Sequence, residues 1–316
     1  MAALYGTVPG PPDYARGGAG GASLGLPAGQ ATGNVFVPGK RRRLNLVAIC
    51  ANIFLPWFAF SAIYAGMSFS LHYQHPSLAI GLAVLGLVAA AVAGAFAARA
   101  RQRGQGEMWY TFFALALLIA TVAAFAFGEL NFSLNMQRFY DIENLNTYPS
   151  VNPARERGQQ LMDAGRVYFA DGTGLDMRKA MAFRNLDLYC VAPIVHGEEQ
   201  LASYDFWAVG VNCCSGVSSD FRCGEFNNPH ARSGLRLMAD DQRPFFRLAV
   251  QQAEAAYNIK STHPLFFIWM QDPVAEMNAY RDSGFRYYLL GVFTHFAFNL
   301  CCTAAAVMAF SKIGNY

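Results

Sequence analysis

Four of the seven cysteines lie in one polar segment of the chain, and they have the clearest potential for chemistry. An even number of cysteines in a segment that faces an oxidising compartment predicts disulfide bonds. A bridge between two neighbouring cysteines would be strained. We therefore expect Cys190 to pair with either Cys213 or Cys214, and Cys223 to pair with the other one.

A zinc site is the alternative chemistry for the same residues. Four thiolates, or three thiolates with the imidazole of His196, would satisfy the tetrahedral coordination that zinc prefers. Adjacent cysteines rarely bind one ion, however, and the sequence contains no Cys-x-x-Cys pair. We therefore favour disulfides, and we predict no metal site and no cofactor.

The other reactive side chains form no recognisable catalytic pattern. The sequence contains no nucleophile elbow, zinc-protease helix, phosphate-binding loop or dinucleotide fingerprint. The run from Asp171 to Gly174, Asp-Gly-Thr-Gly, resembles an aspartic-protease triplet, but that chemistry requires a second carboxylate loop. We expect a turn there, and we predict no catalytic residues and no enzyme activity.

Four long apolar stretches flank the cysteine-bearing segment, and each is close to the ~20 residues needed to cross a bilayer. Charged residues make up 14% of the chain, against about 25% in soluble proteins. Because charges are costly in hydrocarbon, we predict an integral membrane protein with a four-helix transmembrane bundle. The predicted spans are Leu44–Leu71, Leu78–Ala98, Met108–Leu130 and Tyr287–Phe310.

The basic residues beside these spans predict their orientation, because lysine and arginine concentrate in cytoplasmic flanks. All of these basic flanks lie on the cytoplasmic side of the membrane if both termini are cytoplasmic. We expect that membrane to be either the plasma membrane or an endomembrane. The predicted anchors are Lys40, Arg41, Arg42, Arg43, Arg99, Arg101 and Arg103. We interpret the basic run at residues 40–43 as a topology signal, and we predict no nucleic-acid partner.

Composition divides the rest of the chain into tails and an insert. Residues 1–39 are rich in glycine and proline, contain no apolar core of a cleavable signal, and predict a disordered cytoplasmic tail. Residues 40–130 hold three spans, residues 287–310 hold the fourth, and residues 311–316 form a short cytoplasmic tail. Residues 131–286 are then exterior or lumenal.

The insert is predicted to be a disulfide-stapled α+β domain between the third and fourth spans. Between residues 133 and 285, 12 Arg and 2 Lys stand against 18 Asp and Glu, a net charge of −4. Capping residues, turn residues and short apolar or strand-like runs indicate its elements. We expect helices over residues 153–165 and 243–258, and strands over residues 166–170, 186–195, 204–211 and 264–270.

Polar side chains inside the predicted spans are candidate functional residues, because burying them in a membrane is costly. Asn52, His295 and Asn299 are expected to form hydrogen bonds between helices, with a ligand or lipid site as the alternative. Pro56 removes one helical hydrogen bond in the first span.

Small residues in the second span recur at intervals of four. Gly86, Ala90 and Gly94 would let another helix approach closely, either within the chain or in another subunit.

The order of these elements resembles the plan of tetraspanins, as do Cys213-Cys214 and the Ser215-Gly216 that follows. In that family a large exterior loop before the fourth span carries a Cys-Cys-Gly motif. The resemblance implies that Cys190 and Cys223 stand in for the bridging partners of that motif. It covers topology and these few residues.

Two functions fit these features. The first is a non-catalytic membrane organiser or adaptor that displays an exterior protein-binding domain. The alternative is an accessory subunit of a transporter, channel or other membrane complex. The expected partners are membrane lipid and other membrane proteins, including a second copy of this chain.

Overall fold

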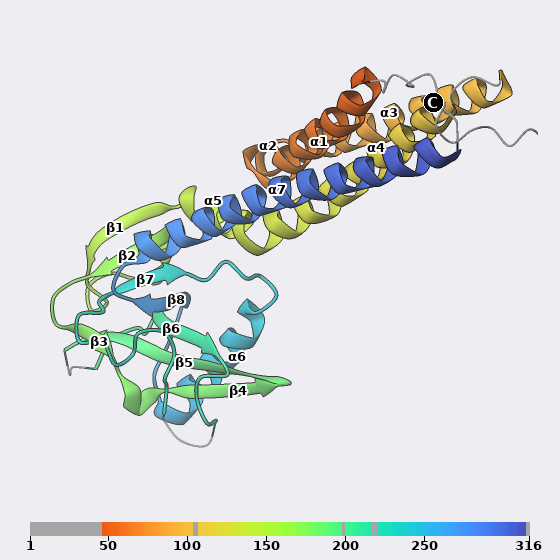
Figure 1. Ribbon diagram of the computed structural model, residues 1–316. Coiled ribbons are helices and arrows are strands. Elements are labelled where there is room, and N and C mark those ends of the chain that lie inside the picture. The colour runs from red at the N-terminus through yellow and green to blue at the C-terminus, as the bar shows by residue number, and fades with distance from the viewer. Residues whose placement is uncertain (1–45, 104–106, 198–199, 217–219, 314–316) are drawn as a thin grey trace, which may run out of the picture. The chain divides into compact units, whose positions relative to one another are not determined.

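The computed structural model describes residues 46–103, 107–197, 200–216 and 220–313 (Figure 1). The predicted tail of residues 1–39, the basic residues 40–43 and the last residues 314–316 lie outside this part of the chain.

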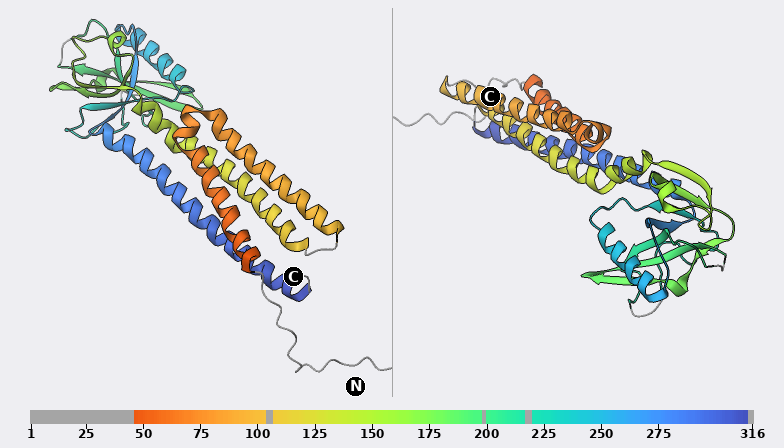
Figure 2. Two further views of the ribbon diagram at one scale, coloured as in Figure 1. Left: turned by 90° about the horizontal axis from the view of Figure 1, so that it is seen from above. Right: turned by 180° about the vertical axis from the view of Figure 1, so that it is seen from behind.

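Four helices in the described residues are long and apolar enough to cross a membrane, which is compatible with an integral membrane protein. Helix α4 packs against three of its neighbours, and Figure 2 shows the four helices running side by side. The short helix α2 (Ser70–Gln74) connects the first two of them. The four are α1 (Leu46–Ser68), α3 (Pro76–Gln102), α4 (Glu107–Asn131) and α7 (Pro273–Ile313).

The two helices that flank the insert are longer than the sequence prediction. Helix α4 continues through a π-helical turn, η1 (Phe132–Met136), into α5 (Gln137–Glu143), so the helical path passes well beyond Leu130. Helix α7 begins 14 residues before the predicted Tyr287. Hydropathy detects the apolar centre of a helix and misses an amphipathic extension whose apolar face packs on protein.

The start of α7 carries a standard capping signal. The Asp272 side chain accepts hydrogen bonds from the backbone N–H groups of Val274 and Ala275, both at 3.0 Å. Pro273 occupies the first helical position, where its missing N–H is not needed. The Asp-Pro pair was therefore available in the sequence as a helix start.

The insert contains an eight-stranded mixed sheet in the order β1-β2-β7-β8-β6-β5-β3, with β4 paired to β5. The pairs β1–β2 and β6–β8 are parallel, and the other pairs are antiparallel. The strands are β1 (Asn146–Val151), β2 (Ala164–Phe169), β3 (Thr173–Leu175), β4 (Met181–Asn185), β5 (Asp187–His196), β6 (Phe206–Val211), β7 (Ser233–Arg236) and β8 (Leu265–Met270).

Most of the predicted elements of the insert are confirmed. Strands β2, β5, β6 and β8 match the four predicted strands, and the turn at Asp171-Gly172 follows β2. Helix α6 (Arg243–Tyr257) is the predicted second helix, and it ends at Asn258, which has a left-handed φ of 52°. Strands β1, β3, β4 and β7 were not predicted, because they are short or weakly apolar.

The predicted helix over residues 153–165 is wrong. The segment holds only a short 3₁₀ helix, η2 (Gly158–Leu161), before β2 begins at Ala164. The Asn152 side chain accepts a hydrogen bond from the N–H of Ala154 at 2.9 Å, which closes a turn. Asparagine before proline serves turns as well as helix starts, and here the tertiary structure selects the turn.

Each face of the sheet has its own apolar core, because successive strand residues point to opposite faces. On β5, Tyr189 and Val191 point toward α6, whereas Cys190 and Ala192 point to the face with the disulfides. Helix α6 covers its face with four buried residues, Phe246, Ala249, Val250 and Ala253.

A third apolar cluster joins the sheet to the extended helices. Phe132, Met136, Phe139 and Ile142 come from the continuation of α4, and Met277 comes from the start of α7. They pack with two residues of the sheet, Leu235 and Met270. The insert therefore rests on the two helices that lead into and out of it.

Candidate functional site: the disulfide-bonded sheet edge and the polar contacts of the helices

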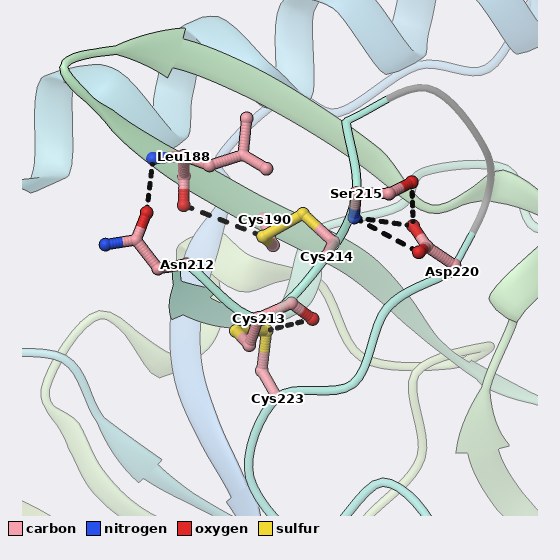
Figure 3. Close-up of a disulfide and its surroundings, with 8 residues drawn as sticks. All are labelled: Leu188, Cys190, Asn212, Cys213, Cys214, Ser215, Asp220 and Cys223. Carbon is pink, nitrogen blue, oxygen red and sulfur yellow. Dashed lines mark hydrogen bonds between the residues drawn. A yellow bond between two sulfur atoms is a disulfide. The ribbon is translucent and has the colours of Figure 1, made fainter.

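One disulfide bond connects strand β5 to the loop that follows β6, and a second one closes a smaller ring within that loop (Figure 3). Cys190 pairs with Cys214 across 24 residues, with the Cα atoms 6.0 Å apart. Cys213 pairs with Cys223 across 10 residues, with the Cα atoms 5.2 Å apart. The expectation of two bonds that separate the neighbouring cysteines is confirmed, and the structure selects one of the two open pairings.

The register of the sheet explains this pairing. Cys190 lies opposite Gly210 on β6, so the chain that leaves β6 passes close to its sulfur. A Cβ atom at Gly210 would lie 2.5 Å from Cβ of Cys223 and 2.6 Å from Sγ of Cys213. Because these distances are shorter than van der Waals contact, Gly210 has to lack a side chain for the second disulfide to pack on the strand.

A side-chain amide holds the loop between β6 and the cysteines. Asn212 has a left-handed φ of 57° and accepts a hydrogen bond from the N–H of Leu188 at 2.9 Å. Its Nδ2 donates to the Asp187 carboxylate at 2.8 Å. Asparagine tolerates the left-handed conformation better than most residues, so it suits this turn.

A second carboxylate orders the chain after Cys214. Asp220 accepts the N–H of Ser215 at 2.9 and 3.1 Å, and it accepts the Ser215 hydroxyl at 2.9 Å (Figure 3). The hydrogen bonds from Ser215 hold the pKa of the Asp220 carboxyl below its usual value, although partial desolvation opposes them. The cysteine loop is thus closed by polar contacts as well as by sulfur.

The sulfur atoms also lie close enough for the zinc alternative to be considered. Sγ atoms of Cys190, Cys213 and Cys223 lie within 4.8 Å of one another. Each of them is bonded to another sulfur, and a disulfide sulfur is not the thiolate that zinc binds. The described geometry is therefore that of a disulfide staple.

One buried carboxylate of the insert that joins several segments was not predicted. Asp205 is 2% exposed and accepts hydrogen bonds from the N–H groups of Gly158, Thr262 and His263 at 2.9–3.1 Å. It also accepts the Ser203 hydroxyl at 2.7 Å. Its donors come from three separate loops, so no local pattern could have identified it.

In the helical bundle, Asn299 forms the polar contact between α1 and α7. Its Nδ2 donates to the main-chain carbonyls of Asn52 at 2.9 Å and Ile53 at 2.8 Å. Asn52 is four residues before Pro56, which has no N–H to offer to that carbonyl. The expected contact between helices is present, and it satisfies the acceptor that the proline leaves open.

The side chains of Asn52 and His295 do not form the expected hydrogen bonds between helices. The Asn52 amide donates within its own helix, to the carbonyl of Ala48 at 2.8 Å. The His295 ring stacks on Phe60 with centroids 4.1 Å apart and an interplanar angle of 3°. Its Nδ1 is buried and has no hydrogen-bond partner among the described residues. The predicted hydrogen bond between helices is therefore formed by Asn299 alone of these three side chains.

The small residues of α3 divide into a packed part and an open part. A Cβ atom at Gly86 would lie 2.7 Å from Ile63 of α1 and 2.8 Å from Thr121 of α4, so this glycine permits a close approach within the chain. Ala90 is buried as well. Gly94 has no described atom within 4 Å of a Cβ position, so it makes no such contact inside the chain.

The described basic anchors lie at one end of the bundle. Arg99, Arg101 and Arg103 are exposed in the last turn of α3 and just after it. Trp109, near the start of α4, packs against Phe310, near the end of α7, with centroids 5.0 Å apart. The helix ends at residues 102, 107 and 313 therefore lie near one another.

These features define a chain with four helices that are long and apolar enough to cross a membrane, and with a mixed sheet that carries two disulfides. Comparison with protein-family models, curated proteins and solved structures finds no match to this chain. The resemblance to tetraspanins stays a prediction from helix order and the Cys213-Cys214 pair.

Proposed function

We propose that this chain is an integral membrane protein that acts as a non-catalytic organiser or adaptor. Its four apolar helices would span the bilayer, and its sheet domain would bind partner proteins on the exterior or lumenal side. The observation that carries this proposal is the apolar cluster of α5, α7, β7 and β8, which couples the domain to two spanning helices. A partner bound to such a domain is held in a defined relation to the membrane.

The orientation in the proposal has two independent supports. Arg99, Arg101 and Arg103 lie at the end of α3, and basic flanks favour the cytoplasmic side. The two disulfides lie in the insert, which is separated from those arginines by one span, and disulfides persist in oxidising compartments. Both termini are then cytoplasmic, as in the tetraspanin plan that the sequence resembles.

We favour a binding role over catalysis because several polar side chains of the insert use their hydrogen bonds to hold loops in place. Asp205 and Asp220 accept backbone N–H groups, and Asn212 joins β5 to the cysteine loop. These contacts stabilise the shape of a surface. The loop after Cys223 adds exposed side chains at Phe226 and Asn227.

An accessory subunit of a larger membrane complex is the second candidate. It is favoured by Gly81 and Gly94, at both of which a Cβ atom would meet no described atom within 4 Å. A helix from another subunit could approach α3 closely at such positions. A helix from a second copy of this chain would also fit against this side of α3.

Site-specific photo-cross-linking in the full chain tests both candidates. A photoreactive residue at Asn227 samples the sheet domain, and one at Gly94 samples the open side of α3. Several membrane partners captured from position 227 support the organiser. One stoichiometric membrane partner captured from position 94 supports the accessory subunit. The absence of specific adducts from both positions would contradict both candidates.

Tag accessibility in intact cells tests the proposed sidedness separately. A tag after Tyr316 should become accessible only after permeabilisation, whereas a tag in the loop around Asn227 should be accessible in intact cells or in the lumen. A C-terminal tag that is accessible from outside would overturn the orientation.

A further inference from the structure

Three arginines and a histidine gather near the N-terminal end of α6, which Asp240 and Asp241 precede in the chain. Arg236, Arg243, Arg247 and His263 line one cavity of about 460 Å³, beside the apolar side chain of Met162. Helix α6 has no acidic residue in its first turn. Because the helix dipole disfavours cations at an N-terminus, the arginines at positions 243 and 247 lie where an anion would be favourable.

Two of these arginines have buried donors that no described atom satisfies. Nη1 of Arg236 and Nε of Arg243 are both buried without a hydrogen-bond partner. An unsatisfied buried donor is costly, and more so on a charged group. Two of the arginines that line the cavity therefore carry donors that no described residue satisfies.

The charge of Arg236 has no carboxylate to balance it among the described residues. Its guanidinium lies over the Phe267 ring, 5.6 Å from the centroid. Burial, together with repulsion from the Arg243 charge, lowers the pKa of Arg236 to about 10. Arg236 remains charged at neutral pH, so a bound anion would relieve the repulsion between the two arginines.

The balance of charges favours a particular class of anion. The one acidic lining residue is Asp240, whose carboxylate is 84% exposed and pairs with Arg243 at 2.9 Å. Three arginines against one carboxylate leave two positive charges, which match a phosphate dianion better than a single carboxylate. Arginine forks also match phosphate geometry.

The cavity lies near the helices that lead to the bundle. Arg236 and Asp240 also line a neighbouring cavity of about 490 Å³, whose lining includes Arg138 and Asp141 of α5 and also Asp241. Helix α5 continues the helical path of α4. A lipid headgroup at the membrane surface and a free phosphate in solution are both sources of the same chemical group.

We propose that the cavity formed by Arg236, Arg243, Arg247 and His263 binds a phosphate group. The Arg236 and Arg243 guanidiniums donate to its oxygens, and Met162 contacts whatever apolar part the ligand carries. This site is independent of the proposed organiser function.

Calorimetric titration with inorganic phosphate, using the full chain in phosphatidylcholine nanodiscs, tests the proposal. We expect saturable binding of one phosphate per chain. The variants R236Q and R243Q should each bind about tenfold more weakly, because each loses a charge-assisted hydrogen bond. The matched control R184Q alters an exposed arginine of β4 that does not line the cavity, and it should bind as the unaltered chain does.

A gain-of-affinity variant keeps the test independent of any folding defect. D240N removes the one competing carboxylate and should strengthen phosphate binding several-fold. Phosphate binding that is equal in R236Q and the unaltered chain, or no saturable binding in any variant, would overturn the proposal.

Nanodiscs that also contain phosphatidic acid distinguish the two sources. If the site takes a lipid headgroup, the lipid should compete with inorganic phosphate, and this competition should disappear in R236Q. If the ligand is a free phosphate, phosphate binding should be unaffected by the lipid. Both outcomes support a phosphate site, and they assign its natural ligand to different sources.

Discussion

The Asn299 side chain donates a hydrogen bond of 2.9 Å to the main-chain carbonyl of Asn52, the acceptor that Pro56 leaves without a helical donor. A polar residue of α7 thus compensates for a proline in α1. The same amide reaches the carbonyl of Ile53 at 2.8 Å. Pro56 is tolerated inside an apolar helix because a neighbouring helix supplies the missing donor.

Replacement of Asn299 by leucine should lower the unfolding free energy by roughly 0.6–1.7 kcal/mol, from the average to the maximum found for hydrogen bonds between membrane helices. The loss should be smaller in a chain that also carries Pro56→Ala, because the alanine N–H can donate to the Asn52 carbonyl. Unfolding of the two single variants and the double variant in mixed micelles measures this coupling. Strict additivity of the two changes would show that the two residues are independent.

Removal of one disulfide by the double substitution Cys213→Ser and Cys223→Ser should destabilise the insert by roughly 3 kcal/mol. The bond between Cys190 and Cys214 should contribute slightly more, because it closes the longer loop and Cys190 is fully buried. Chemical denaturation of the full chain measures both losses. Cys50→Ser, which alters a free cysteine of α1, is the control and should change little.

Non-reducing mass spectrometry checks the pairing itself. It should find peptides that link position 190 to 214 and position 213 to 223. Free thiols at these four positions together with bound zinc would contradict the disulfide assignment.

Asp205→Asn should be among the more damaging single substitutions in the insert, at about 3 kcal/mol. The carboxylate accepts three donors on Oδ1 and the Gly158 N–H on Oδ2. An amide removes the negative charge that all four donors share and presents its NH₂ to the buried Gly158 N–H. Asp187→Asn is a matched control, since Asp187 is exposed and accepts one bond, from Asn212. Similar losses for both variants would contradict the role assigned to Asp205.

Asp176 should give the insert part of its sensitivity to acid. Burial alone would raise the pKa of its carboxyl, but hydrogen bonds from Lys179 and Arg178 outweigh burial and lower that pKa. A lowered pKa in the folded state gives stability that is complete above the unfolded pKa, near 4, and is lost as pH falls through the folded value.

Asp176→Asn tests this dependence on pH. The variant should be less stable than the unaltered chain near neutral pH, and the difference should shrink as the pH falls below about 4. Denaturant unfolding at a series of pH values measures the difference. A difference that stays constant over this range would show that Asp176 does not act through its charge.

Local signals in the sequence were sufficient for much of the fold. Apolar length predicted the four long helices, because exclusion of charge over ~20 residues depends on no distant partner. Short apolar runs predicted β5, β6 and β8, and the Arg-Pro pair predicted the start of α6. The Asp-Pro start of α7 and the apolar spacing from Phe132 to Ile142 were equally local, and a helical period search beyond the hydrophobic centre would have found them.

The residues of the candidate site divide in the same way, into those that local sequence predicted and those that only the tertiary structure brings together. By itself, the sequence determined that four insert cysteines form two disulfides, and that Cys213 and Cys214 take different partners, because the geometry of a disulfide is local. Only the tertiary structure decided which of them meets Cys190, since that depends on the register that sets Cys190 opposite Gly210. The tertiary structure alone also gathered the donors around Asp205 and set Arg236 beside Arg243. Contacts between distant segments depend on how the sheet and helices pack, and no local pattern of residues encodes them.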